Sequence, residues 1–202
     1  MQGKKTVLYK RKREGRTNYK KRLSLLKSNQ PRLIIRKSNK QVIIQIAEYK
    51  PDGDLIICGV NSATLRKHGW KYACNNLSAC YLAGLMLGKR AANKKIKQAV
   101  FDAGLQTPVK GSRIYATLKG VFDAGIKVPV SKDVFPSEDR LKGKHITTYF
   151  KSSKSKEQFA KYKKDKANPE ELEKDFEQLK KKITQNNLNQ KNKKHKESTT
   201  SP

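Results

Sequence analysis

The chain has 202 residues, of which 47 are Lys or Arg and 17 are Asp or Glu, giving a formal net charge of +30. So large an excess opposes compaction of the isolated chain and points to a polyanionic partner: DNA, RNA or an anionic membrane surface. No stretch approaches the roughly 20 apolar residues of a membrane span, and no charged start leads into a secretory signal core. We therefore expect a cytosolic chain with nucleic acid, not a membrane, as its partner.

The length suits one ordinary domain with tails. Cys58, Cys74 and Cys80 form an odd set with no close pair, which argues against a disulfide framework. A zinc site needs four ligands at short paired spacings, whereas His68 precedes Cys74 by six residues. We expect three buried thiols and no metal site.

Composition divides the chain into three zones. Residues 1–30 form a basic arm with ten basic side chains and one acid in the first 22 positions, and nothing there can bury a core. Residues 31–150 hold nearly all the apolar periodicity and predict an α/β core domain. Residues 151–202 predict a helical, Lys-rich extension with a disordered tail. We expect the arm and the tail to become ordered only when the partner binds.

The core zone predicts a mixed sheet with packed helices. Strands are expected at residues 32–36, 41–49 and 55–60, joined by short turns into an antiparallel meander. Helical spacing follows over residues 71–92, then a buried strand at 98–102, and then a helix capped by Ser112 and closed by Gly125.

The C-terminal zone carries one local helix signal. Asn168 and Pro169 are a cap and a first-turn proline, and an apolar stripe follows at Leu172, Phe176, Leu179 and Ile183. The stripe needs a partner surface, either the core domain or another component of an assembly.

The arm is the strongest candidate binding segment. Tyr9 and Tyr19 are interleaved with basic residues, so the rings can stack on unpaired bases while the cations hold phosphates. The alternative is a solubilising or nuclear-targeting tail. The candidate contacts in this arm are Arg11, Arg13, Arg16, Tyr19, Lys20, Lys21 and Arg22.

Two further segments are candidates. The turn after the first strand places three cations and two short polar side chains at a hairpin tip. The tip either probes a groove of a nucleic-acid backbone or is merely solvated. Its members are Arg36, Lys37, Ser38, Asn39 and Lys40. The start of the later helix, at Gly111, Ser112 and Arg113, combines free backbone N–H groups with cations and suits a phosphate. It lacks the glycine spacing of a nucleotide-binding loop, so we expect no cofactor and no small-molecule substrate. Trp70, beside Lys71, either stacks on a base or anchors the following helix.

A five-residue internal repeat raises the alternative that the protein is an enzyme. Asp102 and Asp123 occupy equivalent positions in two copies of Val-Phe-Asp-Ala-Gly, and paired carboxylates can bind Mg²⁺ in a metal-dependent RNA-cleaving enzyme. The copies are expected at a strand end and a helix end, where an Asp before a Gly turn is ordinary. We therefore expect no catalytic residues. A general DNA-compacting protein is a second alternative.

Longer segments carry a resemblance to a known family. KREGRTNYKKRLSLLKSNQPRLIIRKSNKQVIIQI (Lys12 to Ile46), LRKHGWKYACNNLSACYLAGLMLGKRA (Leu65 to Ala91), GSRIYATLKGVFDAG (Gly111 to Gly125) and FPSEDRLKGKHITTYF (Phe135 to Phe150) resemble the archaeal form of the large-subunit ribosomal protein that binds 5S rRNA. Its bacterial counterpart is protein eighteen of the large subunit, and its eukaryotic counterpart is protein five.

The resemblance implies a ribonuclease H-like topology without catalysis. It implies a cytoplasmic, ribosomal location and docking of 5S rRNA onto the large-subunit rRNA in the central protuberance, beside neighbouring ribosomal proteins. It also implies RNA contacts at the arm, the hairpin tip and the Gly111–Arg113 helix start, with Trp70 and Lys71 as further family-like positions. The Lys- and Asn-rich tail departs from the family pattern, so no contacts are carried over to it.

Overall fold

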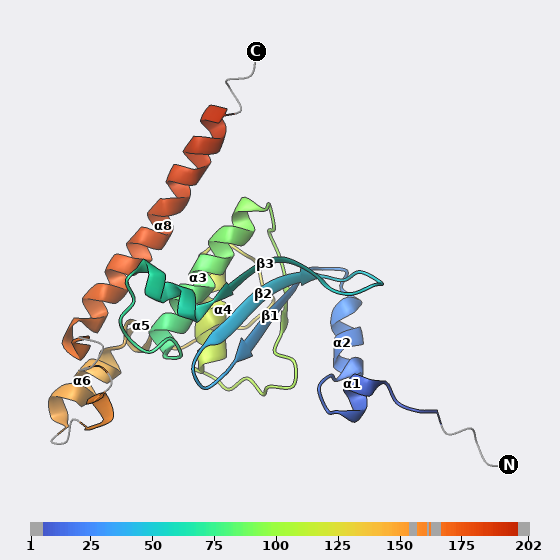
Figure 1. Cartoon of the computed structure of the whole chain (residues 1–202), viewed down its shortest axis with the longest axis horizontal. Helices are drawn as coiled ribbons and strands as arrows, with labels where there is room; N and C mark the ends of the chain where they lie inside the picture. Colours follow the sequence, from blue (N-terminus) through green and yellow to red (C-terminus); the bar gives the residue numbers. More distant parts are fainter. Residues whose placement is uncertain (1–5, 154–156, 161, 163–166, 198–202) are drawn as a thin grey trace.

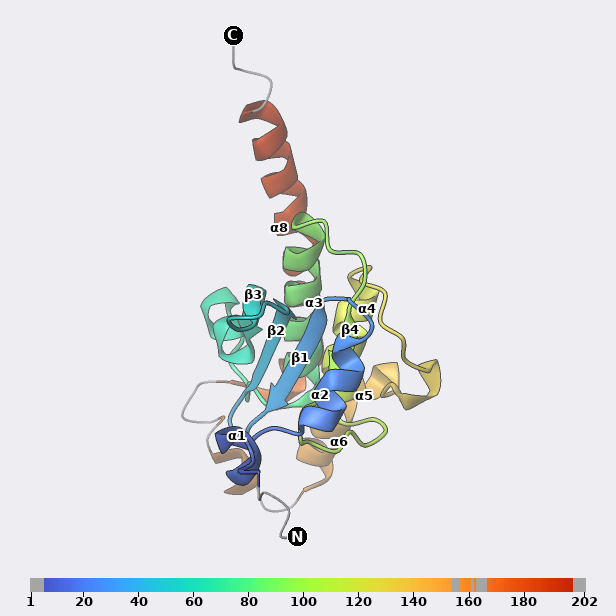
Figure 2. The ribbon, with the colours of Figure 1, turned by 90° about the vertical axis from the view of Figure 1, so that its right-hand side faces the viewer.

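A computed structural model describes residues 6–153, 157–160, 162 and 167–197, with side chains described as far as residue 185. The chain forms layers (Figures 1 and 2). Helices α3 (Leu77–Asn93) and α4 (Arg113–Asp123) cover one face of a sheet, and the arm helix α2 (Tyr19–Leu26) lies on the opposite face. Helix α8 (Leu172–Glu197) packs on the outside of α3 and extends beyond the globule.

The sheet has four strands in the order β3-β2-β1-β4. Strands β1 (Arg32–Lys37), β2 (Val42–Glu48) and β3 (Leu55–Asn61) form the antiparallel meander that the sequence predicts, and β4 (Val100–Asp102) pairs with β1 in parallel. The mixed α/β class is confirmed. The more specific expectation of ribonuclease H-like topology stays a prediction.

Residues of alternating polarity divide the two faces of the sheet. Leu33, Ile35, Ile44 and Ile46 are fully buried on the face towards α3 and α4. Successive side chains of a strand point to opposite faces. Arg32 and Arg36 therefore share the other face, four residues apart on β1. Apolar periodicity thus decides which arginines face the arm.

Helices α3 and α4 approach each other unusually closely. Gly84 faces the backbone of Thr117, and Gly88 faces Val121, so the two helices run in the same direction and begin at the same end of the molecule. Gly120 lies against the backbone of Tyr81 in the same way. A side chain at any of these glycines would force the helices apart.

The first core helix starts later than predicted. Residues 71–92 were expected to be helical, but α3 begins at Leu77, where the Asn76 side chain accepts a hydrogen bond from the Ala79 N–H at 2.7 Å. Before it, the 3₁₀ helix η1 (Ser62–His68) ends at Gly69, whose φ of 98° is left-handed. Residues 70–76, between these two caps, are not helical, although apolar spacing alone placed the start of the helix at residue 71.

The C-terminal segment packs on the core. After η2 (Lys132–Val134), the short helices α5 (Glu138–Lys142), α6 (Lys144–Ser152), η3 (Glu157–Phe159) and η4 (Pro169–Glu171) lead into α8. The apolar stripe of α8 (Leu172, Phe176, Leu179, Ile183) is buried, and the ring of Phe176 lies 5.7 Å from that of Tyr81 on α3. The partner of the stripe is therefore the core domain. The helix continues to Glu197, further than the stripe, whereas a disordered tail was expected; the last five residues lie outside the described part. The divisions at residues 30 and 150 stay divisions by composition.

Candidate RNA-binding surface

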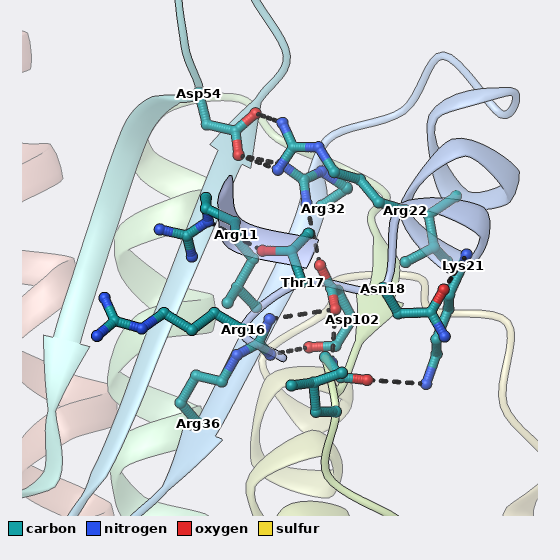
Figure 3. Close-up of a pocket in the computed structure, with 14 residues that line it drawn as sticks. Arg11, Arg16, Thr17, Asn18, Lys21, Arg22, Arg32, Arg36, Asp54 and Asp102 are labelled. Carbon is teal, nitrogen blue, oxygen red and sulfur yellow. Dashed lines mark hydrogen bonds and ion pairs between the residues drawn. The ribbon is translucent and has the colours of Figure 1, made fainter. Parts of the chain in front are cut away.

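The arm is attached to the sheet by charged contacts (Figure 3). Helix α1 (Lys10–Arg13) and α2 bury none of their own residues, as the composition predicts. Arg22 nevertheless donates two hydrogen bonds to Asp54, at 2.9 and 2.8 Å, and the Lys21 ammonium donates to the Gly104 carbonyl at 3.2 Å. The expectation that the arm orders only on binding thus differs from this structure, in which ion pairs substitute for a hydrophobic core.

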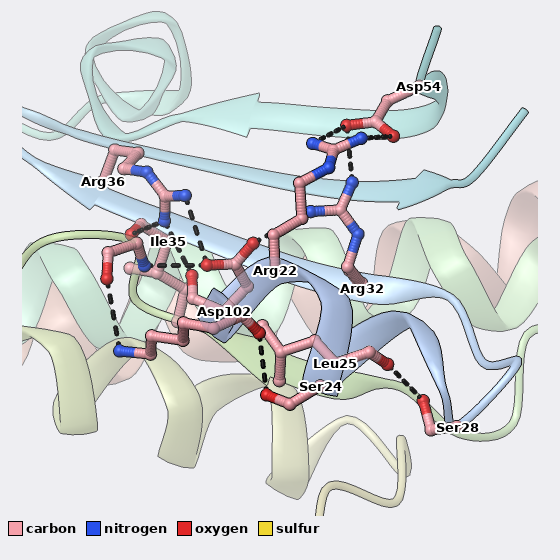
Figure 4. A network of polar contacts seen from close by, with 11 residues as sticks. Arg22, Ser24, Leu25, Ser28, Arg32, Ile35, Arg36, Asp54 and Asp102 are labelled. Atoms are coloured by element: carbon pink, nitrogen blue, oxygen red, sulfur yellow. Dashed lines mark hydrogen bonds and ion pairs between the residues drawn. The ribbon is translucent and has the colours of Figure 1, made fainter. Parts of the chain in front are cut away.

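The attachment belongs to an alternating row of charges (Figure 4). Arg32 pairs with Asp54 at 2.5 Å and with Asp102 at 3.0 Å, and Arg36 pairs with Asp102 at 3.3 Å. Arg32 is only 3% exposed, which an arginine tolerates when both ends of its guanidinium face carboxylates. Burial by itself raises the pKa of Asp54, but the hydrogen bonds and charges of Arg22 and Arg32 outweigh it and leave that pKa lowered.

A hollow of about 230 Å³ lies between the arm and the sheet. Six cationic side chains line it against two carboxylates: Arg11, Arg16, Lys21, Arg22, Arg32 and Arg36 against Asp54 and Asp102. The excess of positive charge in a partly enclosed space suits phosphate oxygens. Arg13 and Lys20 are exposed on the same arm, and the Tyr19 ring lies 5.2 Å from that of Tyr9.

The hairpin tip is held in a fixed conformation. The Ser38 N–H donates to the Gln41 carbonyl at 2.8 Å, and the Ser38 hydroxyl accepts from the Gln41 N–H at 3.1 Å. The Gln106 side chain bonds both backbone groups of Lys37, at 3.1 and 2.8 Å. Ser38, Asn39 and Lys40 are exposed, so the tip presents its polar groups from a rigid turn.

The start of α4 lies beside this tip. Arg113 donates to the Ser38 carbonyl at 3.3 Å and to the Asn75 carbonyl at 3.4 Å, and the Asn75 amide donates to the Asn39 carbonyl. Ser112 occupies the cap position as predicted, with Gly111 before it in a left-handed conformation, but the Ser112 hydroxyl makes no capping hydrogen bond. Contacts with carbonyls leave the positive charge of Arg113 intact.

Together these contacts link the three predicted segments through β1 and the end of β4. Arg32, Asp54 and Gln106 join these segments and were not among the residues predicted from the sequence. The alternation of Arg32 with Arg36 along one strand face was the only sequence signal for the first. Nothing local marks Asp54 or Gln106, because their partners lie 32 and 69 residues away.

Trp70 lies differently from the other candidates. It is 2% exposed, its ring meets Tyr72 edge-on at 5.1 Å, and its Nε1–H donates to the Ala73 carbonyl at 3.3 Å. A buried ring has no face open to a base, so the geometry favours the alternative of an anchor before α3. Lys71, by contrast, is exposed.

The carboxylates of the two repeat copies both make hydrogen bonds or ion pairs within the fold. Asp102 ends β4 in the charge row, whereas Asp123 ends α4 and accepts from the Tyr81 hydroxyl at 2.9 Å, with Lys119 at 3.7 Å. The copies thus lie on different kinds of element, as predicted. The three cysteines are free and buried. No helix in the described residues is long and apolar enough to cross a bilayer.

The mixed α/β fold carries a basic arm and a basic hairpin tip, which together suit the phosphates of a nucleic acid. Residues 4–100 match the family described as ribosomal large subunit proteins 60S L5 and 50S L18. The match, over just under half of the chain, supports a ribosomal protein of the large subunit, and with it ribosomal RNA and other ribosomal proteins as partners. The match includes the arm, the hairpin and α3. It ends before Gly111–Arg113, so the resemblance of the later segments stays a prediction.

Proposed function

We propose that this chain binds 5S rRNA and helps to dock it onto the large-subunit rRNA in the central protuberance, as a scaffold without catalysis. The observation that carries the proposal is that hydrogen bonds connect the basic arm and the hairpin tip to the same part of the sheet. The two are joined through β1 and the end of β4, by Lys21 on Gly104 and by Gln106 on Lys37.

This connection supports recognition of a folded RNA rather than of any polyanion. Counterion release from phosphates supplies affinity without regard to sequence or shape. Two basic elements held at a fixed separation by a rigid sheet favour an RNA whose phosphates have matching positions. The rings of Tyr9 and Tyr19 can stack on an unpaired base.

The test is a titration at moderate salt of the full chain with 5S rRNA, tRNA and duplex DNA of similar length. We expect the tightest binding to 5S rRNA, weakened by Arg13→Ala and by Lys37→Ala. Losing one phosphate-contacting lysine lowers the slope of log K against log salt by about one. The matched control is Lys181→Ala, which removes an exposed cation from α8.

The outcomes separate the alternatives. Equal affinity for all three nucleic acids would overturn the 5S assignment and favour a general compacting protein. Mg²⁺-dependent cleavage of RNA that Asp102→Asn abolishes would favour the enzyme.

A further inference from the structure

The turn between β2 and β3 differs from the rest of the surface. It extends beyond the helices that cover the two sheet faces (Figure 1). Tyr49 and Ile56 are each 53% exposed and Leu55 is 47% exposed. Because consecutive residues of a strand point to opposite faces, Leu55 and Ile56 leave both sides of the tip apolar.

The charge of this tip is opposite to that of the chain. Residues 48–54 contain three acids and one lysine, whereas the whole chain has 47 basic and 17 acidic residues. Asp54 is held by Arg22 and Arg32, but Glu48 and Asp52 are exposed, and no ion pair joins either of them to the described residues. Free carboxylates beside apolar side chains repel a phosphate backbone and attract a basic surface.

The neighbouring edge of the sheet is covered. Strand β3 lies at the edge, and its outward carbonyls accept hydrogen bonds from the end of α3 and the residue after it: Gly59 from Arg90 at 3.0 Å and Ile57 from Lys94 at 2.5 Å. These cations block the addition of another strand along residues 57–59. Contact with a partner is thereby directed to the side chains of the tip.

We propose that residues 48–56, the β2–β3 tip, are a docking surface for another ribosomal protein, one with an apolar recess rimmed by basic side chains. An apolar centre with a charged rim is the usual arrangement of a protein–protein contact. Charge decides the class of partner, since the tip combines apolar contact with negative charge on a chain whose RNA-facing segments are strongly basic.

A double charge reversal separates a protein partner from RNA. Glu48→Lys with Asp52→Lys raises the net charge by four at two exposed positions, which would strengthen an RNA contact and weaken a contact with a basic protein. Tagged wild-type and variant chains are co-expressed with the untagged chain, and the tagged fraction in purified large subunits is measured. We expect the variant to be incorporated about five- to tenfold less, with undiminished affinity of the free chain for 5S rRNA.

The proposal is overturned by unchanged or increased incorporation, which is the outcome expected if the tip contacts RNA. It is overturned equally by a parallel loss of 5S rRNA affinity, because that loss would itself account for the poorer incorporation. A second measurement keeps the test independent of incorporation. A benzoylphenylalanine photo-crosslinker in place of Ile56, in assembled subunits, should form a protease-sensitive, ribonuclease-resistant adduct with a basic ribosomal protein. An adduct with rRNA, or none, would count against the proposal. The same crosslinker in place of Lys37 should attach to rRNA, and its failure to do so would bear on the proposed function instead.

Discussion

Replacing Asp102 with asparagine tests whether the charge row stabilises the fold. Asp102 is 5% exposed, and its carboxylate faces Arg32 at 3.0 Å and Arg36 at 3.3 Å. Asparagine keeps the shape of the side chain and removes its charge. The change therefore leaves the buried Arg32 with one carboxylate instead of two.

The expected loss follows from the burial of the pair. Removing one partner of a fully buried ion pair costs about 3–5 kcal/mol, because the remaining charge is uncompensated. Here Arg32 keeps Asp54 at 2.5 Å, and Arg36 is partly in water. We therefore expect Asp102→Asn to lower the free energy of unfolding by about 2–3 kcal/mol, less than the cost of breaking a fully buried pair.

Urea unfolding of the full chain measures this loss. Trp70 is the single tryptophan and is buried, so its fluorescence reports the transition. The matched control is Glu177→Gln, which removes the partner of Lys142 in a half-exposed pair at 3.4 Å and should cost less than about 0.5 kcal/mol. High salt should reduce the control effect more than the Asp102 effect. The reasoning is refuted if the two variants lose equal stability.

Three further predictions concern other parts of the fold. Asp54→Asn should lower the free energy of unfolding by about 1 kcal/mol near neutral pH. Because the folded-state pKa of Asp54 is lowered, this contribution is present above the ordinary value of 3.8 and is lost as pH falls through the folded pKa. The stabilities of wild type and variant should therefore converge in acid unfolding curves, and divergence there would contradict the assignment. Gly120→Ala should lower the free energy of unfolding by more than about 2 kcal/mol, because the new methyl group would meet the Tyr81 backbone; a urea midpoint equal to wild type would show that the helices separate freely. Phe176→Ala should cost about 3–4 kcal/mol and expose α8 to limited proteolysis, whereas the exposed neighbour change Glu177→Ala should leave the digestion pattern unchanged.

The strands of the meander were predictable because local patterns specify them. Alternating apolar residues in β1 and β2 identify a half-buried strand whatever lies around it, and a turn signal separates the second strand from the third. The start of α3 was less predictable, because it is set by the Asn76 cap, which apolar spacing does not reveal. The candidate RNA segments came from charge and tyrosine interleaving, and their contacts with RNA stay predictions.

The sequence by itself determined the class of partner, since the charge of +30 holds in any conformation. It also determined the apolar stripe of α8 and the face of β1 that carries Arg32 and Arg36, because both follow from local periodicity. Only the tertiary structure decided that the stripe packs on α3, that Trp70 is buried, and that the arm is held on the sheet. Those outcomes depend on contacts such as Arg22 with Asp54, 32 residues apart, and Arg32 with Asp102, 70 residues apart. The physical reason is that an ion pair requires two side chains to meet in space, and no local pattern records which distant residue folding brings into range.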